Sequence, residues 1–305
     1  MKKDFHLFTP RTTFRTSGGN EESKLVGQNP PTGVVLQYHI AHEIEKESIV
    51  KMEFLDDNEN IIRTITNQKS KSAKTFGGSY NPVKIPAKKG MNRFVWNFRI
   101  DDIKLVPDVS FFGGYSGYRV GPGQYSVRLT MGEESTTQSF KIQQDPRIDI
   151  RNRDQNEHQS LMADLYSQIN DLHSSIVKAR SIRSQIQKMN ERLKEKDAVQ
   201  DLIQSGESAI EAIDNWEGNV VQTKMETFQD VVNFLNRLNA HMLNLLSTID
   251  GSDPPLTQGQ RQRYADLSEE WESYKKKLNQ IMNNEISEFN RLYKKEDLPA
   301  VIIPE

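Results

Sequence analysis

One short segment of the sequence combines side chains of the types that bind metal ions. His39, His42 and Glu43 place two imidazoles and a carboxylate close together. Residues three apart on a strand point to opposite faces, and the helical zinc motif needs a spacing of four between its histidines. Metal ligands must also converge in a fixed geometry. We therefore interpret these residues as the polar end of a strand, and we predict neither a metal site nor a cofactor.

A second segment, residues 56–60, contains only Asp, Asn and Glu and has the composition of a calcium-binding loop. It lacks the central glycine and the glutamate at the twelfth position that an EF-hand requires. Asp and Asn favour tight turns, and the segment separates two apolar runs at 49–55 and 61–65. The sequence therefore predicts a hairpin turn here.

No catalytic motif is recognisable in the sequence. A Gly-x-Ser-x-Gly elbow, a P-loop and a dinucleotide-binding fingerprint are all absent. Glycoside hydrolysis needs two carboxylates held roughly 5–10 Å apart across a cleft. No acidic residue is paired with a sugar-stacking aromatic in a known motif. We predict no catalytic residues in this chain.

An aromatic loop with several glycines, residues 111–118, is the strongest candidate for binding. Tyrosine and phenylalanine rings on such a loop could stack on a sugar or fill a pocket of a partner. The alternative is that the same rings cover the open end of the β domain or its junction with the helices. The candidate ligand-binding or partner-binding residues are Phe111, Phe112, Tyr115 and Tyr118.

Composition narrows the class of protein. The 305 residues include 40 basic and 42 acidic side chains, a balance that argues against a general nucleic-acid binder. No run of about 18 apolar residues exists, so we predict no transmembrane segment. The first residues carry two lysines but no apolar stretch, and we do not expect them to form a signal peptide as they stand. The absence of cysteine excludes disulfides and thiolate ligands.

The hydrophobic period changes sharply at residues 145–147. Before this point apolar residues alternate, as in Tyr125, Val127 and Leu129; after it they recur at spacings of three and four. These periods are typical of strands and helices respectively. We therefore predict an α+β fold in two domains, an Ig-like antiparallel β-sandwich followed by an antiparallel four-helix bundle. The boundaries are an extended lead-in at 1–32, the sandwich at 33–146, the bundle at 150–294 and an extended tail at 295–305.

Within these domains, the segment 90–100 is the clearest strand. Helices are predicted up to about residue 193, then over 197–216 and 223–249, with a fourth after an N-cap at Thr257. Arg147 follows the last strand, and we hypothesise that it pairs with an acidic group at the junction of the domains. The third helix carries a stripe of seven apolar residues: Phe228, Val231, Leu235, Leu238, Met242, Leu245 and Ile249.

Several motifs, in this order along the chain, resemble those of one family. The motifs are LFTPR at 7–11, GQNPPTG at 27–33, GMNRFVWNFR at 90–99, GPGQY at 121–125, QDPR at 144–147, QDVVNF at 229–234 and DPPLT at 253–257. Together they resemble the C-terminal region of large secreted bacterial proteins, chiefly from the Bacteroidetes, that carry a sortilin-type BNR (Asp-box) β-propeller. These proteins are often labelled glycosyl hydrolase or sialidase-like. The resemblance covers essentially the whole chain.

The resemblance implies a non-catalytic accessory module, located in the periplasm or outside the cell. Its partner would be the β-propeller domain or another envelope protein. The activity that the family label suggests would lie mainly in the propeller, whose Asp-box repeat is absent from this sequence. Two alternatives remain open: a carbohydrate-binding module that uses the loop 111–118 to hold a glycan, and a glycoside hydrolase in its own right, which we favour least.

Overall fold

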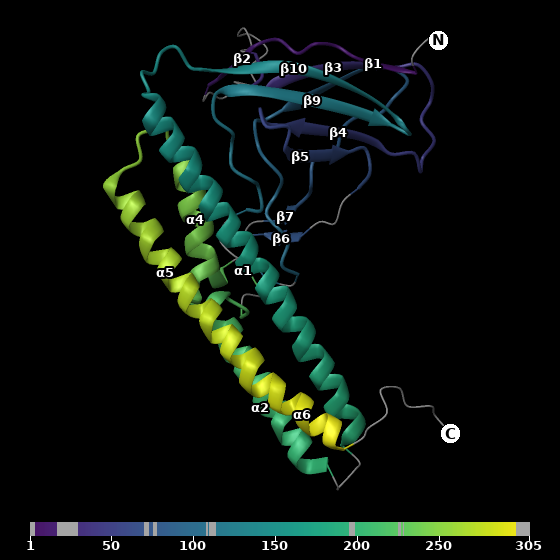
Figure 1. Ribbon diagram of the computed structural model, residues 1–305. Helices are drawn as coiled ribbons and strands as arrows, with labels where there is room; N and C mark the ends of the chain where they lie inside the picture. The colour runs from purple at the N-terminus through teal and green to yellow at the C-terminus, as the bar shows by residue number, and fades with distance from the viewer. Residues whose placement is uncertain are drawn as a thin grey trace.

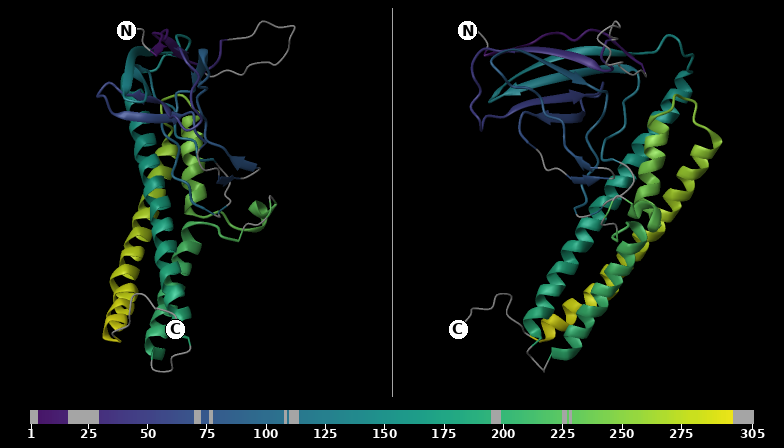
Figure 2. Two further views of the ribbon diagram at one scale, coloured as in Figure 1. Left: turned by 90° about the vertical axis from the view of Figure 1, so that its right-hand side faces the viewer. Right: turned by 180° about the vertical axis from the view of Figure 1, so that it is seen from behind.

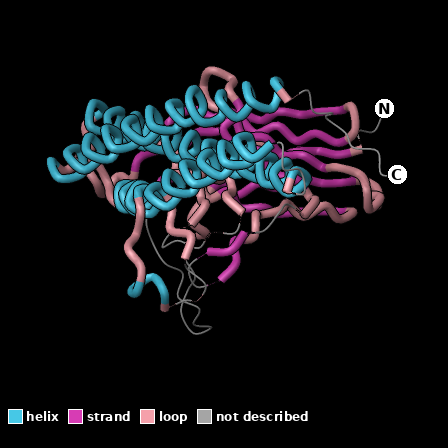
Figure 3. Tube along the Cα trace, turned by 90° about the horizontal axis from the view of Figure 1, so that it is seen from below, coloured by secondary structure: helices cyan, strands magenta, loops and turns pink. Residues whose placement is uncertain are grey.

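The computed structural model describes residues 4–16, 30–69, 73–75, 78–107, 109, 114–194, 199–224, 227 and 229–296. Two β-sheets lie at one end of the molecule, and a rod of helices extends away from them (Figures 1 and 2). Seen from below, the strands extend past the helices on one side (Figure 3). The fold is therefore α+β, with the strands first in the sequence and the helices after them.

The strands form two main sheets and one small hairpin. The three-stranded sheet has the order β1 (Phe5–Leu7), β3 (Val34–Ile40), β8 (Gly90–Trp96). The five-stranded sheet has the order β2 (Thr13–Arg15), β10 (Glu134–Gln144), β9 (Gly123–Met131), β4 (Val50–Leu55), β5 (Ile61–Thr66). The hairpin pairs β6 (Ala73–Thr75) with β7 (Gly78–Tyr80). Among these strand pairs, β2 with β10 is parallel and the others are antiparallel.

The sheets pack face to face around aromatic side chains. Trp96 from the three-stranded sheet stacks on Phe54 from the five-stranded sheet, with ring centroids 4.2 Å apart and the planes at 21°. Tyr125 and Phe140 contact the Trp96 ring from the side, each at a centroid distance of 6.1 Å. The alternation of apolar residues along the strands places these rings inside, as the sequence predicts.

The strand β8 is shorter than the predicted strand 90–100. It ends at Trp96, and Phe98 has a positive φ of 65°, which turns the chain out of the sheet. The Phe98 side chain is nevertheless fully buried in the sandwich core. The turn at 56–60 is confirmed: the Asp56 Oδ1 atom accepts hydrogen bonds from the backbone N–H groups of Asn58 and Asn60, at 2.9 and 2.8 Å.

The helical rod contains one helix that runs its whole length. The helices are α1 (Asn152–Leu193), α2 (Gln200–Val220), the short α3 (Asp230–Asn233), α4 (Leu238–Asp250), α5 (Gln258–Ile281), the π-helical turn η2 (Met282–Ile286) and α6 (Ser287–Lys295). In Figure 1, α4 lies beside the upper half of α1 and α2 beside its lower half. The elements α5, η2 and α6 follow one another without a break. In the described residues the rod therefore has three helical columns.

The prediction of an Ig-like sandwich followed by an antiparallel four-helix bundle is wrong. The two main sheets have three and five strands, and two of these strands, β1 and β2, come from the segment predicted as an extended lead-in. These two strands are only three residues long, too short to show a period in the sequence. The second and third predicted helices share one column, because α2 and α4 both pack along α1, one beyond the other.

The predicted helix 223–249 begins only at Leu238. A buried side chain, Gln222, holds the two ends of the preceding loop together. Its Nε2 atom donates to the Leu235 carbonyl at 2.9 Å, and its Oε1 atom accepts from the Lys224 backbone N–H at 2.9 Å. Asparagine and threonine in this loop are also weak helix formers. The chain therefore leaves this helical column at the end of α2 and joins the same column again at the start of α4.

The break divides the predicted apolar stripe. Leu238, Met242, Leu245 and Ile249 are buried in the core of the rod, as predicted. Leu235 is 76% exposed, contrary to the prediction. Phe228 and the side chain of Val231 lie outside the described residues. The N-cap at Thr257 is confirmed, because its side chain and that of Gln260 form a reciprocal capping box.

Two leucine substitutions test the position of the break. We expect Leu235→Ala to change the free energy of unfolding by less than about 0.5 kcal/mol, because the side chain is exposed. Leu238→Ala removes a side chain that is 1% exposed and should cost about 2–5 kcal/mol. Urea unfolding of both variants measures the difference. Equal losses in the two variants would show instead that one continuous helix buries both leucines.

Candidate functional site

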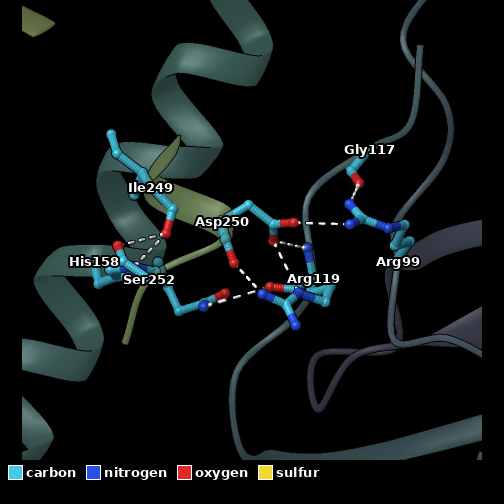
Figure 4. A network of polar contacts seen from close by, with 8 residues as sticks. Arg99, Gly117, Arg119, His158, Ile249, Asp250 and Ser252 are labelled. Carbon is cyan, nitrogen blue, oxygen red and sulfur yellow. Dashed lines mark hydrogen bonds and ion pairs between the residues drawn. The ribbon is translucent and has the colours of Figure 1, made fainter. Parts of the chain in front are cut away.

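A buried carboxylate joins the helical rod to the sandwich. Asp250 is the last residue of α4, and its side chain is only 7% exposed. Its Oδ2 atom lies 2.9 Å from Nη2 of Arg99, and its Oδ1 atom accepts from the backbone N–H of Arg119 at 2.7 Å (Figure 4). The carboxylate is therefore paired with two cations that both belong to the sandwich.

The backbone brings the two arginines together. Arg99 follows β8 and Arg119 precedes β9, and the two residues form an isolated antiparallel bridge. Arg119 also donates through Nη2 to the main-chain carbonyl of Asp250. A helix leaves its last carbonyls without intrahelical partners, and its C-terminal end carries a partial negative charge. Arg119 supplies a hydrogen-bond donor to one of these carbonyls and places a positive charge beside the negative end of α4.

The first turns of α1 attach to the same place. His158 is fully buried, and its Nε2 atom lies 3.1 Å from the carbonyl oxygen of Ile249. Because a carbonyl only accepts, Nε2 carries the hydrogen. The Ser252 hydroxyl donates to the same carbonyl at 3.0 Å. Burial lowers the pKa of His158, so the ring is neutral.

A second joint is formed by the connecting segment, residues 101–107, which runs along α1 between β8 and β9. The Tyr166 hydroxyl donates to the Asp101 carbonyl at 3.0 Å. One turn further along α1, the Asn170 side chain accepts from the backbone N–H of Lys104 at 2.8 Å. The connecting segment is thus bound to α1 through its main chain.

The far end of the connecting segment is held by a buried ion pair. Arg180 of α1 donates to the Pro107 carbonyl, and its Nε atom lies 2.6 Å from Oε1 of Glu217. Glu217 belongs to α2 and is 2% exposed. A neighbouring arginine, Arg183, lies 3.0 Å from the other oxygen of this carboxylate. The same network therefore ties the segment to α1 and α2 together.

His173 fills the space between the connecting segment and the rod. It is fully buried, with Nδ1 2.6 Å from the Lys104 carbonyl and Nε2 2.7 Å from the side-chain oxygen of Asn239. Burial lowers the pKa of His173, which favours the neutral ring with its hydrogen on Nδ1. The Lys104 carbonyl can only accept, so Nδ1 donates to it. Both ring nitrogens are engaged in holding the joint.

A shallow groove of about 560 Å³ lies beside this joint. Its surface is mostly apolar, with Val177 at 43% exposure on its floor. Lys104 reaches across the rim to the Ser174 hydroxyl at 2.9 Å. The Ser174 hydroxyl accepts from Lys104 and donates to the Asn170 carbonyl at 2.7 Å, so its hydrogen is directed to the main chain of α1. The residues that line it are Lys104, Leu105, His173, Ser174, Val177, Lys178, Ser181, Ile182 and Gln185.

The structure places two of the four predicted binding residues inside the molecule. Tyr115 is fully buried, and its hydroxyl donates to the Val106 carbonyl at 3.2 Å. Tyr118 is half-buried and packs edge-on against Tyr166 of α1, with ring centroids 5.7 Å apart. Both rings cover the junction with the helices, the alternative that the sequence left open. Phe111 and Phe112 lie outside the described residues, and their role in binding stays a prediction.

The histidine segment at 39–43 does not bring its side chains to one point. His39 faces His6 on the neighbouring strand β1, and His42 lies 3.4 Å from Asp4 with both side chains largely exposed. Across the described ranges of the chain, no three His, Asp or Glu side chains are grouped as metal ligands. Arg147 pairs with an acidic group as we hypothesised, namely Asp145 in its own turn between β10 and α1.

The residues that build the junction were missed by the sequence analysis. The sequence offered a signal for the two histidines, because His158 and His173 continue the buried stripe of α1 formed by Leu161, Leu165 and Leu172. A histidine on such a stripe has to find hydrogen-bond partners in the interior. Arg99, Arg119 and Asp250 carried no comparable signal, since charged residues usually face solvent.

Comparisons with known proteins leave the family unassigned. The chain matches no protein-family model and no curated protein. Among solved structures it shows a weak likeness to "pT26-6p", with 10% sequence identity and a TM-score of 0.15. The match covers 91% of this chain and 49% of that one, so the chain spans about half of the length of that protein. A likeness at this level carries no argument about fold or function.

The described helices include none with both the length and the apolar composition that a membrane span needs. This agrees with the absence of a long apolar run in the sequence.

Replacing the buried carboxylate tests the junction. Asp250→Asn keeps the shape of the side chain but leaves Arg99 and Arg119 facing a neutral amide. We expect a loss of roughly 3 kcal/mol in the free energy of unfolding, at the low end for a broken buried pair, because the two arginine side chains are 28% and 20% exposed. Denaturant unfolding measures the loss. Asp266→Asn, on the exposed face of α5, should leave stability unchanged; equal effects would contradict the role of Asp250.

The two buried histidines predict a loss of stability in acid. Their pKa values are lowered in the folded state. Below about pH 6.5 the unfolded chain therefore binds more protons than the folded chain, and acid favours unfolding. Each histidine then removes at most about 1.4 kcal/mol per pH unit from the free energy of unfolding. We expect His158→Gln, whose amide can still donate to Ile249, to weaken this dependence between pH 7.5 and 5.5. The exposed His241→Gln should keep it; an identical pH dependence in all three proteins would refute the assignment.

Proposed function

We propose that this chain is a non-catalytic positioning module, in which the sandwich and the helical rod hold a partner domain at a fixed distance and angle. The observation that carries the proposal is the buried Asp250 carboxylate with Arg99 and Arg119 on either side. An ion pair with several hydrogen bonds has one favourable arrangement, and its disruption leaves buried charges unpaired. This favours a single orientation of the rod on the sandwich.

The second joint supports the same function. The connecting segment contacts α1 from Tyr166 to Arg180, so the attachment extends over about four helical turns. Tyr118 and Tyr166 pack against both the core of the sandwich and the core of the rod. The 42 residues of α1 make it about 60 Å long. A rod of this length, held at one end over several turns, is suited to setting a distance between two bodies.

The partner that we propose is the one implied by the sequence resemblance, a β-propeller domain or another protein of the bacterial envelope. Both sheets of the sandwich carry exposed apolar side chains that could make such a contact. Phe8 and Met91 are 41% and 60% exposed, and Phe14 on β2 is 45% exposed. Exposed aromatic and methionine side chains are enriched at protein interfaces. These side chains support a binding role for the sandwich end of the molecule.

Distance measurements between spin labels test whether the module is rigid. The chain has no cysteine, so pairs can be introduced without background labelling. Glu133→Cys lies in the turn between β9 and β10, and Lys188→Cys lies on the lower half of α1; both sites are exposed. We expect one narrow distance distribution in double electron–electron resonance, because two joints fix the rod.

A pair within the rod, Lys188→Cys with Glu207→Cys on α2, serves as the control for label motion. The distribution between sandwich and rod should be about as narrow as that of the control. A broad or multiple distribution for the first pair alone would mean that the rod moves on the sandwich, and the proposed function would then fail.

A further inference from the structure

A third arginine at the junction is buried, and two of its nitrogen atoms have no partner among the described residues. Arg15, the last residue of β2, is 6% exposed. Its Nε and Nη2 atoms are buried, and among the described residues they have no hydrogen-bond partner. An arginine stays charged at all physiological pH values. A buried charge without a counter-charge is strongly unfavourable. We therefore expect this guanidinium group to have an anionic partner.

The strand register places Arg15 at the junction. Arg15 is opposite Gln144 in the parallel pair of β2 with β10. In the antiparallel pair of β10 with β9, Ile142 is opposite Gly123. Extending that register by two residues brings Gln144 opposite Gly121, so Arg15, Gln144 and Gly121 follow one another across the sheet. Arg15 therefore lies beside the turn that begins at Arg119.

Two further polar groups face this place. The Gln155 amide of α1 packs against Gly121, its Nε2 atom 2.9 Å from where a Cβ on that glycine would lie. Both polar atoms of this amide are buried without a hydrogen-bond partner. Arg119 uses Nε and Nη2 on Asp250, and its Nη1 atom donates to no acceptor in the described part of the chain. We call Arg15, Arg119 and Gln155 the Arg15 cluster.

The charges around the cluster do not balance. Three guanidinium groups, from Arg15, Arg99 and Arg119, share one buried carboxylate, Asp250. Asp253 is near enough to act on Arg15, but it is exposed to solvent, which screens its charge. Burial lowers the pKa of Arg15 most and the charge of Arg119 lowers it further, while Asp250 and Asp253 act in the opposite direction. The cluster thus attracts anions.

We propose that the Arg15 cluster binds one small inorganic oxyanion of the sulfate or phosphate class. A tetrahedral oxyanion offers several acceptor oxygens, which suit the paired N–H groups of guanidinium forks and an amide N–H. His158 takes no part as a donor, because its hydrogen is on Nε2 and points to Ile249. The anion would connect β2, the turn before β9 and α1. This inference does not depend on the proposed positioning function.

The competing source of negative charge is the protein itself. Asp253 could turn inward, and the carboxylates of Glu21 and Glu22 follow Arg15 in the sequence but lie outside the described residues. A carboxylate from the chain would occupy the cluster and exclude an added anion. Binding of sulfate to the wild-type protein therefore separates the two sources.

Isothermal titration with sodium sulfate at constant ionic strength tests the proposal. We expect the wild-type protein to bind one sulfate, and Arg15→Gln to weaken binding about tenfold or more, because charge-assisted hydrogen bonds are lost. Arg291→Gln is the matched control, because this arginine is exposed and lies on α6 at the other end of the rod. It should bind sulfate like the wild type.

Crystals of the wild-type protein grown with selenate provide a measurement that does not depend on the folding of a variant. The anomalous signal of selenium should place a selenate ion with its oxygens within hydrogen-bond distance of Nε or Nη2 of Arg15. A signal only elsewhere would overturn the proposal. So would the absence of sulfate binding by the wild type, including the case in which a Glu21→Gln, Glu22→Gln double variant or Asp253→Asn binds it instead.

Discussion

The burial of one carboxylate, Asp250, governs how the two halves of this protein are arranged. A carboxylate at the C-terminal end of a helix meets the negative end of the helix dipole, and burial makes it less favourable still. It is stable there only because Arg99 and Arg119 come from the sandwich to pair with it. The helix α4 must therefore end against the sandwich, in one orientation.

The shape of the rod follows from this constraint. Because α4 has to reach the sandwich, it occupies the upper half of a column whose lower half is filled by α2, and the chain loops out between them at 221–237. The long helix α1 spans both halves and carries His158 and His173 to the two joints. The segment that leaves the sandwich after β8 runs along α1 before it returns as β9. The result is a rod fixed to the sandwich at one end (Figure 1).

Local patterns in the sequence predicted the local parts of this structure. The alternation in β9, the turn at 56–60 and the cap at Thr257 depend on neighbouring residues, and the structure has them. The break before Leu238 involves one buried side chain, Gln222, which bonds to the Leu235 carbonyl. The spacing of apolar residues from 228 to 249 continues through the break and therefore does not reveal it. The pairing of Arg99 with Asp250 joins residues far apart in the sequence. Tyr115 shows a further limit, because an aromatic residue on a glycine-rich loop has the same sequence signature whether it binds a ligand or fills a core.

The central claim is that the sandwich and the rod form one cooperative unit through Asp250 and the connecting segment. Differential scanning calorimetry measures this most directly. We expect a single unfolding transition whose calorimetric and van't Hoff enthalpies agree, since neither half can unfold without exposing the buried charges of the junction. Two separate transitions, one for the sandwich and one for the helices, would show that the junction does not hold them together and would contradict the account.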